Sequence, residues 1–152
     1  MMTEAKAIMP EHFAQLLGYC DHRMHTIMDR KLHKYNITPM QCRTLMYLFY
    51  QEGDVNQRML ERFLMVQPST VNGIVNRLEE KGFVRRENGT QDGRCRILHL
   101  TEAGNQFREE LMTVMDEIIE IMEKGLTKKQ VQTLYDLLLR VSHNVGKEVK
   151  EV

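Results

Sequence analysis

Apolar residues recur at spacings of three and four along most of the chain, the pattern of amphipathic helices. Turn-forming and helix-capping residues punctuate these runs, which sets the expected ends of the helices. The pattern predicts six helices: residues 11–34, Pro39 (capped by Thr38) to near Gly53, a short helix from Asn56, Pro68 to Gly82, a long one from Thr101, and a last one after residues 124–129.

The helical pattern is interrupted once, in the middle of the chain. Two β-type runs, "FVRRE" (83–87) and "RILHL" (96–100), flank the stretch "ENGTQDGRCR" (87–96). Asn88-Gly89 and Asp92-Gly93 are turn-forming pairs, so the two runs are expected to fold back on each other as a hairpin. The sequence therefore predicts a mainly α protein with a small β-hairpin, in the order four helices, hairpin, two helices.

The predicted helix from Pro68 has two contrasting faces. At 100° per residue, one stripe gathers the apolar side chains Val71, Ile74, Val75 and Leu78. The other side gathers small polar residues, flanked by Thr70 and Arg77: Ser69, Asn72, Gly73 and Asn76. Such a face is either plainly solvated or suited to the major groove of DNA, and the short preceding helix and the following hairpin favour the second interpretation.

Composition and charge narrow the classes of protein to which the chain could belong. The chain of 152 residues has no net charge, yet residues 56–96 carry +3 and residues 101–123 carry −6, so the predicted DNA-contacting region is locally basic. We find no apolar run of 18 residues and no signal-peptide pattern in the first residues, so we expect a cytoplasmic protein that is not inserted in a membrane. The chain has no Gly-rich phosphate loop, HExxH or GxSxG motif, so we do not expect an enzyme.

Two segments together resemble a known signature. "STVNGIVNRLEEKGFVRR" followed by "QDGRCRILHLTEAG" resembles that of the MarR family of winged helix-turn-helix transcriptional regulators. The resemblance rests on "RLEEKGFVRR", on the pair Asp92 and Arg94, and on Leu100-Thr101-x-x-Gly104. With the order of helices it extends over residues 10–150.

This resemblance implies an architecture and a set of partners. Within a single domain, 1–152, it implies a winged helix-turn-helix lobe (36–100) with six helices in all and a two- to three-stranded wing sheet. Residues 10–35 and 101–150 would then form dimerisation helices. The implied partners are double-stranded DNA, read as a pseudo-palindrome, and a second copy of the chain. Family members are often repressors relieved by a small aromatic acid, a metal or an oxidant, which implies a ligand-responsive repressor and no cofactor.

The family pattern also implies residue roles. The helix from Pro68 would read the major groove, while Arg94 would enter the minor groove and Asp92 would brace the wing. Asn72 and Asn76 suit bidentate contacts to adenine. The arginines that suit phosphates are Arg77, Arg85, Arg86 and Arg96. The implied DNA-binding residues are Gln67, Pro68, Ser69, Thr70, Asn72, Gly73, Asn76, Arg77, Arg86, Arg94 and Arg96, with Arg85 as a further phosphate contact.

Two sensing alternatives compete with simpler interpretations. Some relatives sense peroxide through a cysteine on the first helix, but the position of Cys20 matches poorly and lies in the apolar stripe, which favours a buried structural thiol. Cys95 is expected to be exposed on the wing. One side of the first helix carries residues at spacings that a metal site can use: His22, His25, Asp29 and His33. This side is polar and is interpreted as solvated, so no metal is expected.

The twelve methionines leave two interpretations open. One is a dimer core that tolerates irregular packing. The other is an adaptable pocket for an aromatic or other lipophilic effector, which Tyr19, Tyr47 and Tyr50 would line. A winged-helix interaction module that does not bind DNA is the remaining alternative. Arg94 and Arg96 on the predicted wing argue against it.

Overall fold

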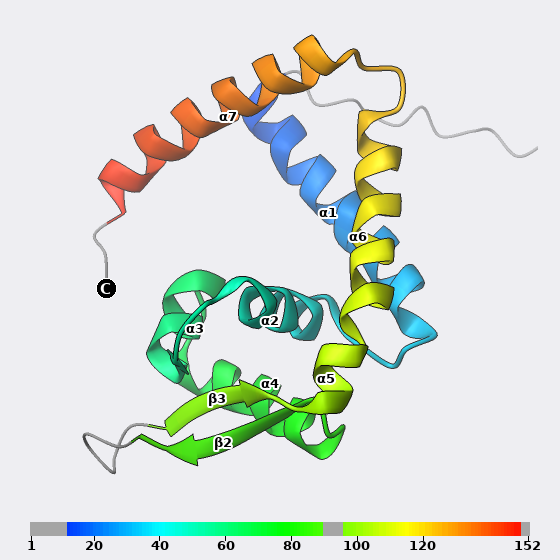
Figure 1. Cartoon of the computed structure of the whole chain (residues 1–152). Helices are drawn as coiled ribbons and strands as arrows, with labels where there is room; N and C mark the ends of the chain where they lie inside the picture. Colours follow the sequence, from blue (N-terminus) through cyan, green and yellow to red (C-terminus); the bar gives the residue numbers. More distant parts are fainter. Residues whose placement is uncertain (1–11, 90–95, 150–152) are drawn as a thin grey trace, which may run out of the picture. The chain divides into compact units, whose positions relative to one another are not determined.

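The computed structural model describes residues 12–89 and 96–149. The chain forms two compact units, residues 1–115 and residues 116–152. The first unit holds most helices and the sheet (Figure 1): α1 (Phe13–His33), α2 (Pro39–Tyr50), α3 (Gln57–Leu64), α4 (Pro68–Glu80), α5 (Glu102–Gln106) and the first half of α6 (Arg108–Glu123).

Helix starts in the first unit follow the capping residues that the sequence predicts. Thr38 and Gln41 form a capping box, in which the Gln41 N–H donates to Thr38 Oγ1 at 3.2 Å and the Thr38 N–H donates to Gln41 Oε1 at 3.3 Å. Asn56 Oδ1 accepts from the Met59 N–H at 3.1 Å and so caps α3. These predicted caps are confirmed.

The sheet has three antiparallel strands in the order β1-β3-β2. They are β1 (Val55–Asn56), β2 (Val84–Asn88) and β3 (Arg96–Leu100), so the predicted hairpin is confirmed and β1 adds a third strand. Val55 pairs with Leu98, and Val84 with Leu100, and the side chains of Val55, Val84 and Leu98 are buried. Figure 1 shows the hairpin lying beside α4 within the first unit.

The predicted long helix from Thr101 is interrupted once, at Phe107, which separates α5 from α6. The Phe107 ring stacks on Phe83 at 4.8 Å and meets Tyr35 edge-on at 5.3 Å. Two further contacts hold the start of α5 to the segment between α4 and β2. The Thr101 hydroxyl donates to the Gly82 carbonyl at 2.5 Å, and the Thr101 N–H donates to the Phe83 carbonyl at 3.0 Å. Gly104 is buried at the same place, where no side chain would fit.

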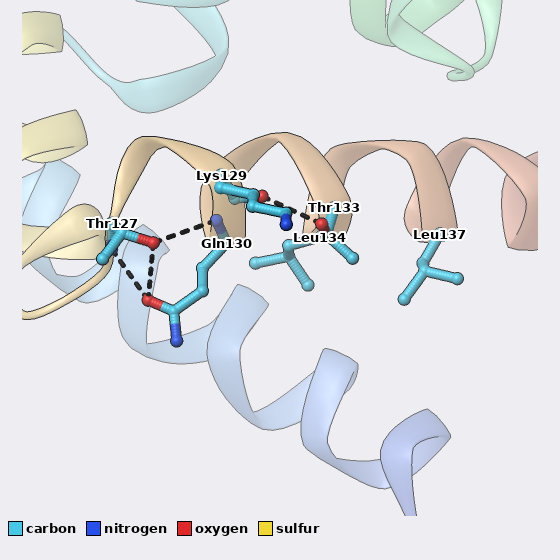
Figure 2. A pocket seen from close by; sticks show the side chains of 6 residues that line it. All are labelled: Thr127, Lys129, Gln130, Thr133, Leu134 and Leu137. Atoms are coloured by element: carbon cyan, nitrogen blue, oxygen red, sulfur yellow. Dashed lines mark hydrogen bonds between the residues drawn. The ribbon is translucent and has the colours of Figure 1, made fainter.

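The second unit contains α7 (Lys128–Glu148), which begins with a capping box between Thr127 and Gln130 (Figure 2). Its predicted apolar stripe is not buried within the single chain: none of the described residues of α7 is buried. Among the residues that the structure describes, none of the helices has the length and apolar character needed to cross a bilayer.

Candidate nucleic-acid interface

Helices α3 and α4 are joined by a three-residue turn. Met65 adopts the left-handed conformation (φ 55°, ψ 45°), and the N–H groups of Met65 and Val66 both donate to the Glu61 carbonyl. Gln57 Nε2, at the start of α3, donates to the Pro68 carbonyl at 3.3 Å. These contacts fix the direction in which α4 leaves the turn, as a helix-turn-helix requires.

The two faces of α4 are those that the sequence predicts. The apolar stripe is buried, with Ile74 the most exposed of its four residues at 9%. The structure brings all the predicted α4 site residues together on the exposed side: Gln67, Pro68, Ser69, Thr70, Asn72, Gly73, Asn76 and Arg77. A Cβ at Gly73 would meet nothing within 4 Å, so the backbone there is open to an incoming partner. In the described part of the chain no side chain caps α4, which leaves its first N–H groups available to an anion.

Arg86 does not lie as a phosphate-contacting residue would. Its side chain is only 10% exposed and forms an ion pair with Glu79 near the end of α4. The Arg86 backbone N–H donates to Glu79 Oε1 at 2.9 Å, and Nη2 donates to Asn72 Oδ1 at 3.1 Å. The guanidinium therefore joins β2 to the exposed face of α4, and the phosphate contact expected of Arg86 stays a prediction. Sequence reasoning missed Glu79, because a helix-to-strand contact leaves no periodic signal.

The remaining wing residues are mostly exposed. Arg96 is exposed at the start of β3, opposite Asn88. Arg85 forms an ion pair with Glu87, and His99 Nε2 lies 3.3 Å from Glu87 Oε2. Asp92, Arg94 and Cys95 fall outside the described residues, so their expected positions at the wing tip stay predictions.

The far end of α4 is tied to the α1–α2 turn by Lys81. Its ammonium group donates to Gln41 Oε1 at 2.8 Å and contacts the Asn36 carbonyl. Burial lowers the pKa of Lys81, and the nearby positive charge of Arg77 lowers it further. Both ends of α4 are thus held by hydrogen bonds while its polar face stays open.

The candidate sensing residues fall in different surroundings. Cys20 is exposed in the single chain, so the expectation of a buried thiol there is corrected: the apolar stripe around it is not covered by this chain. Of the two cysteines that the structure describes, Cys42 on α2 is the buried one, and burial raises its pKa to about 11. Such a thiol stays protonated and unreactive at neutral pH.

The histidine set on α1 does not converge. His25 Nδ1 approaches the Asp21 carbonyl oxygen at 2.9 Å and lies 3.4 Å from its carboxylate. Within residues 12–89 and 96–149 no three His, Cys, Asp or Glu side chains are grouped so that they could hold a metal ion. Asp29 and His33 instead line a small cavity of about 230 Å³ with Asn36, Ile37 and Thr38.

The three tyrosines of the expected effector pocket each have a separate partner. Tyr47 packs on Phe63 at 4.5 Å, and Arg23 lies over the Tyr19 ring at 5.0 Å. The Tyr50 hydroxyl donates to Met112 Sδ at 3.3 Å. Each of the three rings is therefore engaged within the chain, and the effector pocket stays a prediction.

A short helix, a tight turn, a second helix with an open polar face and a paired hairpin together define a winged helix-turn-helix protein. The chain belongs to the MarR family of winged-helix transcriptional regulators. The sequence model of that family matches residues 35–94, which hold α2 to α4 and the first strand of the hairpin.

Characterised relatives and a solved structure agree with this assignment. The chain is 31% identical to the HTH-type transcriptional repressor IacR of Pseudomonas putida, over 78% of this chain and 70% of that one. It is 30% identical to the HTH-type transcriptional regulator MgrA of Staphylococcus aureus, over 76% of each chain. The fold is similar to that in the crystal structure of an S. aureus MepR–DNA complex, with a TM-score of 0.81, 25% identity and coverage of 89% of this chain and 99% of that chain.

Proposed function

We propose that this chain is a transcriptional regulator that binds double-stranded DNA at a specific sequence through α4 and the wing. The observation that carries the proposal is the polar, open face of α4, held between the α3 turn and the hairpin. Ser69, Thr70 and Asn76 would meet base edges there, and Arg77 and Arg96 would meet phosphates. Arg94 and Asp92 keep their proposed roles at the wing, in the minor groove and as its brace.

The proposal includes a homodimer. Helix α7 exposes apolar side chains that a second copy would cover: Leu134, Tyr135, Leu137, Leu138, Leu139 and Val145. Leu134 and Leu137 line an open groove of about 460 Å³ (Figure 2). On α1, Phe13, Leu16 and Leu17 are exposed in the same way. We thus propose that the dimer is held by residues 10–35 and 101–150, and that DNA is bound by residues 36–100. Two such DNA-binding lobes predict an operator whose half-sites lie about one helical turn apart.

The same proposal includes repression of transcription by the DNA-bound protein and relief of that repression by a small aromatic or lipophilic effector. Arg108 lies over the rings of Phe49 and Tyr50 at 5.5 and 5.8 Å, beside the Tyr50–Met112 contact. A cation beside two aromatic rings would suit a ligand that is both apolar and acidic. We further propose a cytoplasmic protein without enzymatic activity.

Binding to DNA from the region upstream of the gene that encodes this chain tests the function. Fluorescence anisotropy at several salt concentrations should show one segment bound far more tightly than unrelated duplexes of the same length. Arg94→Ala should weaken binding to every duplex, and Asn72→Ala should relax the preference at particular bases. Equal, weak binding to all duplexes would refute a sequence-specific regulator.

A further inference from the structure

We propose that Arg86 and Glu79 set the base specificity of Asn72 by fixing the orientation of its side-chain amide, so that Asn72 reads guanine rather than adenine. This inference rests on the proposed function and deepens it. It makes Arg86 a positioning residue and not a contact to the DNA backbone.

The contacts form a chain from β2 to the face of α4. Glu79 receives both the Arg86 backbone N–H, at 2.9 Å, and the guanidinium, which fixes where that guanidinium lies. The second arm of the guanidinium then donates to Asn72 Oδ1 at 3.1 Å and reaches the Asn72 carbonyl at 3.5 Å. With its side chain 10% exposed, Arg86 is held within the protein while Asn72 is exposed.

The chemistry of these groups allows one orientation of the amide. A guanidinium carries five N–H donors and no acceptor, so the atom of Asn72 that faces it must be the oxygen. The amide nitrogen, with its two N–H donors, is then the half left for a base. An isolated asparagine would be free to turn either half outward, whereas this one is oriented before DNA arrives.

The orientation changes which base fits. The usual contact of asparagine with adenine uses both halves of the amide, since adenine offers an acceptor at N7 and a donor at N6. The Asn72 amide oxygen has two lone pairs, and in this structure the charged guanidinium of Arg86 occupies one of them, which makes the oxygen a weaker acceptor for adenine N6. Guanine offers two acceptors in the major groove, N7 and O6, which matches a group that presents donors alone. The adenine contact expected for Asn72 from the sequence is therefore replaced by guanine.

Selection of bound duplexes from a randomised library, with the full-length protein, tests this assignment. The position read by Asn72 is the one whose preference is lost in Asn72→Ala, and we expect guanine there for the wild type. Arg86→Lys keeps the positive charge but lacks the fork that bridges Glu79 and Asn72. It should reduce the guanine preference at that one position by on the order of tenfold, with adenine rising, and leave other positions unchanged. The matched control is Arg43→Lys on α2, where the guanidinium lies over the Phe63 ring and has no assigned DNA contact, so it should change no base preference.

The outcomes separate the inference from the proposed function. An adenine preference at the Asn72 position, or a guanine preference that Arg86→Lys leaves intact, would overturn the inference while the regulator stands. No preference for any sequence would refute the proposed function and the inference with it. A loss of affinity in Arg86→Lys that is equal for all duplexes would overturn the inference by showing a phosphate contact instead.

A measurement on the wild-type protein avoids any question of whether a variant folds. Replacing the guanine at the Asn72 position by 7-deazaguanine removes the N7 acceptor and leaves the base pair intact. We expect affinity to fall on the order of tenfold, with no change when a guanine outside the bound site is replaced. Unchanged affinity at the Asn72 position would overturn the assignment.

Discussion

Gly104→Ala should destabilise the protein through a single methyl group. A Cβ at this position would lie 2.2 Å from the backbone carbonyl oxygen of Phe83 and 3.1 Å from its carbon. Non-bonded heavy atoms prefer separations near 3.5 Å, so the two segments must move apart by roughly 1 Å. The carbonyl cannot yield freely, because it accepts the Thr101 N–H at 3.0 Å.

The expected cost follows from three terms. Forcing an extra methyl group into a packed site costs about 1–3 kcal/mol, and weakening the Thr101–Phe83 hydrogen bond adds about 1 kcal/mol. Alanine in place of glycine within a helix returns roughly 0.5–1 kcal/mol. The net loss in free energy of unfolding is about 1–3.5 kcal/mol, which for a chain of this length lowers Tm by roughly 2–14 °C.

Thermal and urea unfolding, followed by circular dichroism, measure this loss. Variants must be compared at one protein concentration, because a dimer's Tm depends on concentration. Gly73→Ala is the matched control: it lies within α4, has nothing within 4 Å of the added Cβ, and should gain roughly 0.5–1 kcal/mol. If Gly104→Ala were as stable as the wild type, the close approach of α5 to Phe83 would be wrong.

Three further changes test other parts of the structure. Leu134→Glu with Leu138→Glu should convert the proposed dimer to a monomer in light scattering, and an unchanged mass would place the interface elsewhere. Asn56→Ala should cost about 1 kcal/mol in urea unfolding by removing the α3 cap, and no loss would refute its capping role. Burial raises the pKa of Cys42 from 9.0 to about 11, so its contribution to stability is complete below pH 9 and is lost as pH rises through about 11. The wild type should therefore lose stability more steeply than Cys42→Ala between pH 9 and 11, and parallel pH profiles would contradict that burial.

The features that the sequence predicted are those with local causes. Thr38 and Asn56 cap helices through contacts three residues away, so residue type and spacing suffice to find them. The buried stripe of α4 follows from helical periodicity in the same way. Cys20 shows the limit of this kind of prediction. Periodicity detects an apolar face of a helix, but it does not reveal whether this chain or a second copy covers that face.

The residue pattern by itself did not predict the features that depend on distant partners, and the third strand was implied only by the family resemblance, as part of a two- to three-stranded sheet. Strand β1 is two residues long, and Val55 becomes a strand residue only because Leu98, far along the chain, pairs with it. The contact of Arg86 with Glu79 and Asn72 crosses from a helix to a strand around Gly82, whose φ of 76° turns the chain. Residue type alone could equally place Arg86 on a phosphate.

The ion pairs of the two arginines on β2 affect the DNA affinity and the base specificity of this surface in different ways. Residues 56–96 carry a net charge of +3, yet Arg85 and Arg86 are both engaged by carboxylates of the same region. An arginine that contacts phosphate adds affinity for every duplex, whereas an arginine that orients an asparagine adds only discrimination between bases. Orienting the amide before binding also removes an ordering cost that a freely rotating side chain would incur. The local charge of residues 56–96 attracts every duplex alike, so the proposed pre-oriented surface would supply the discrimination between sequences that this charge cannot supply.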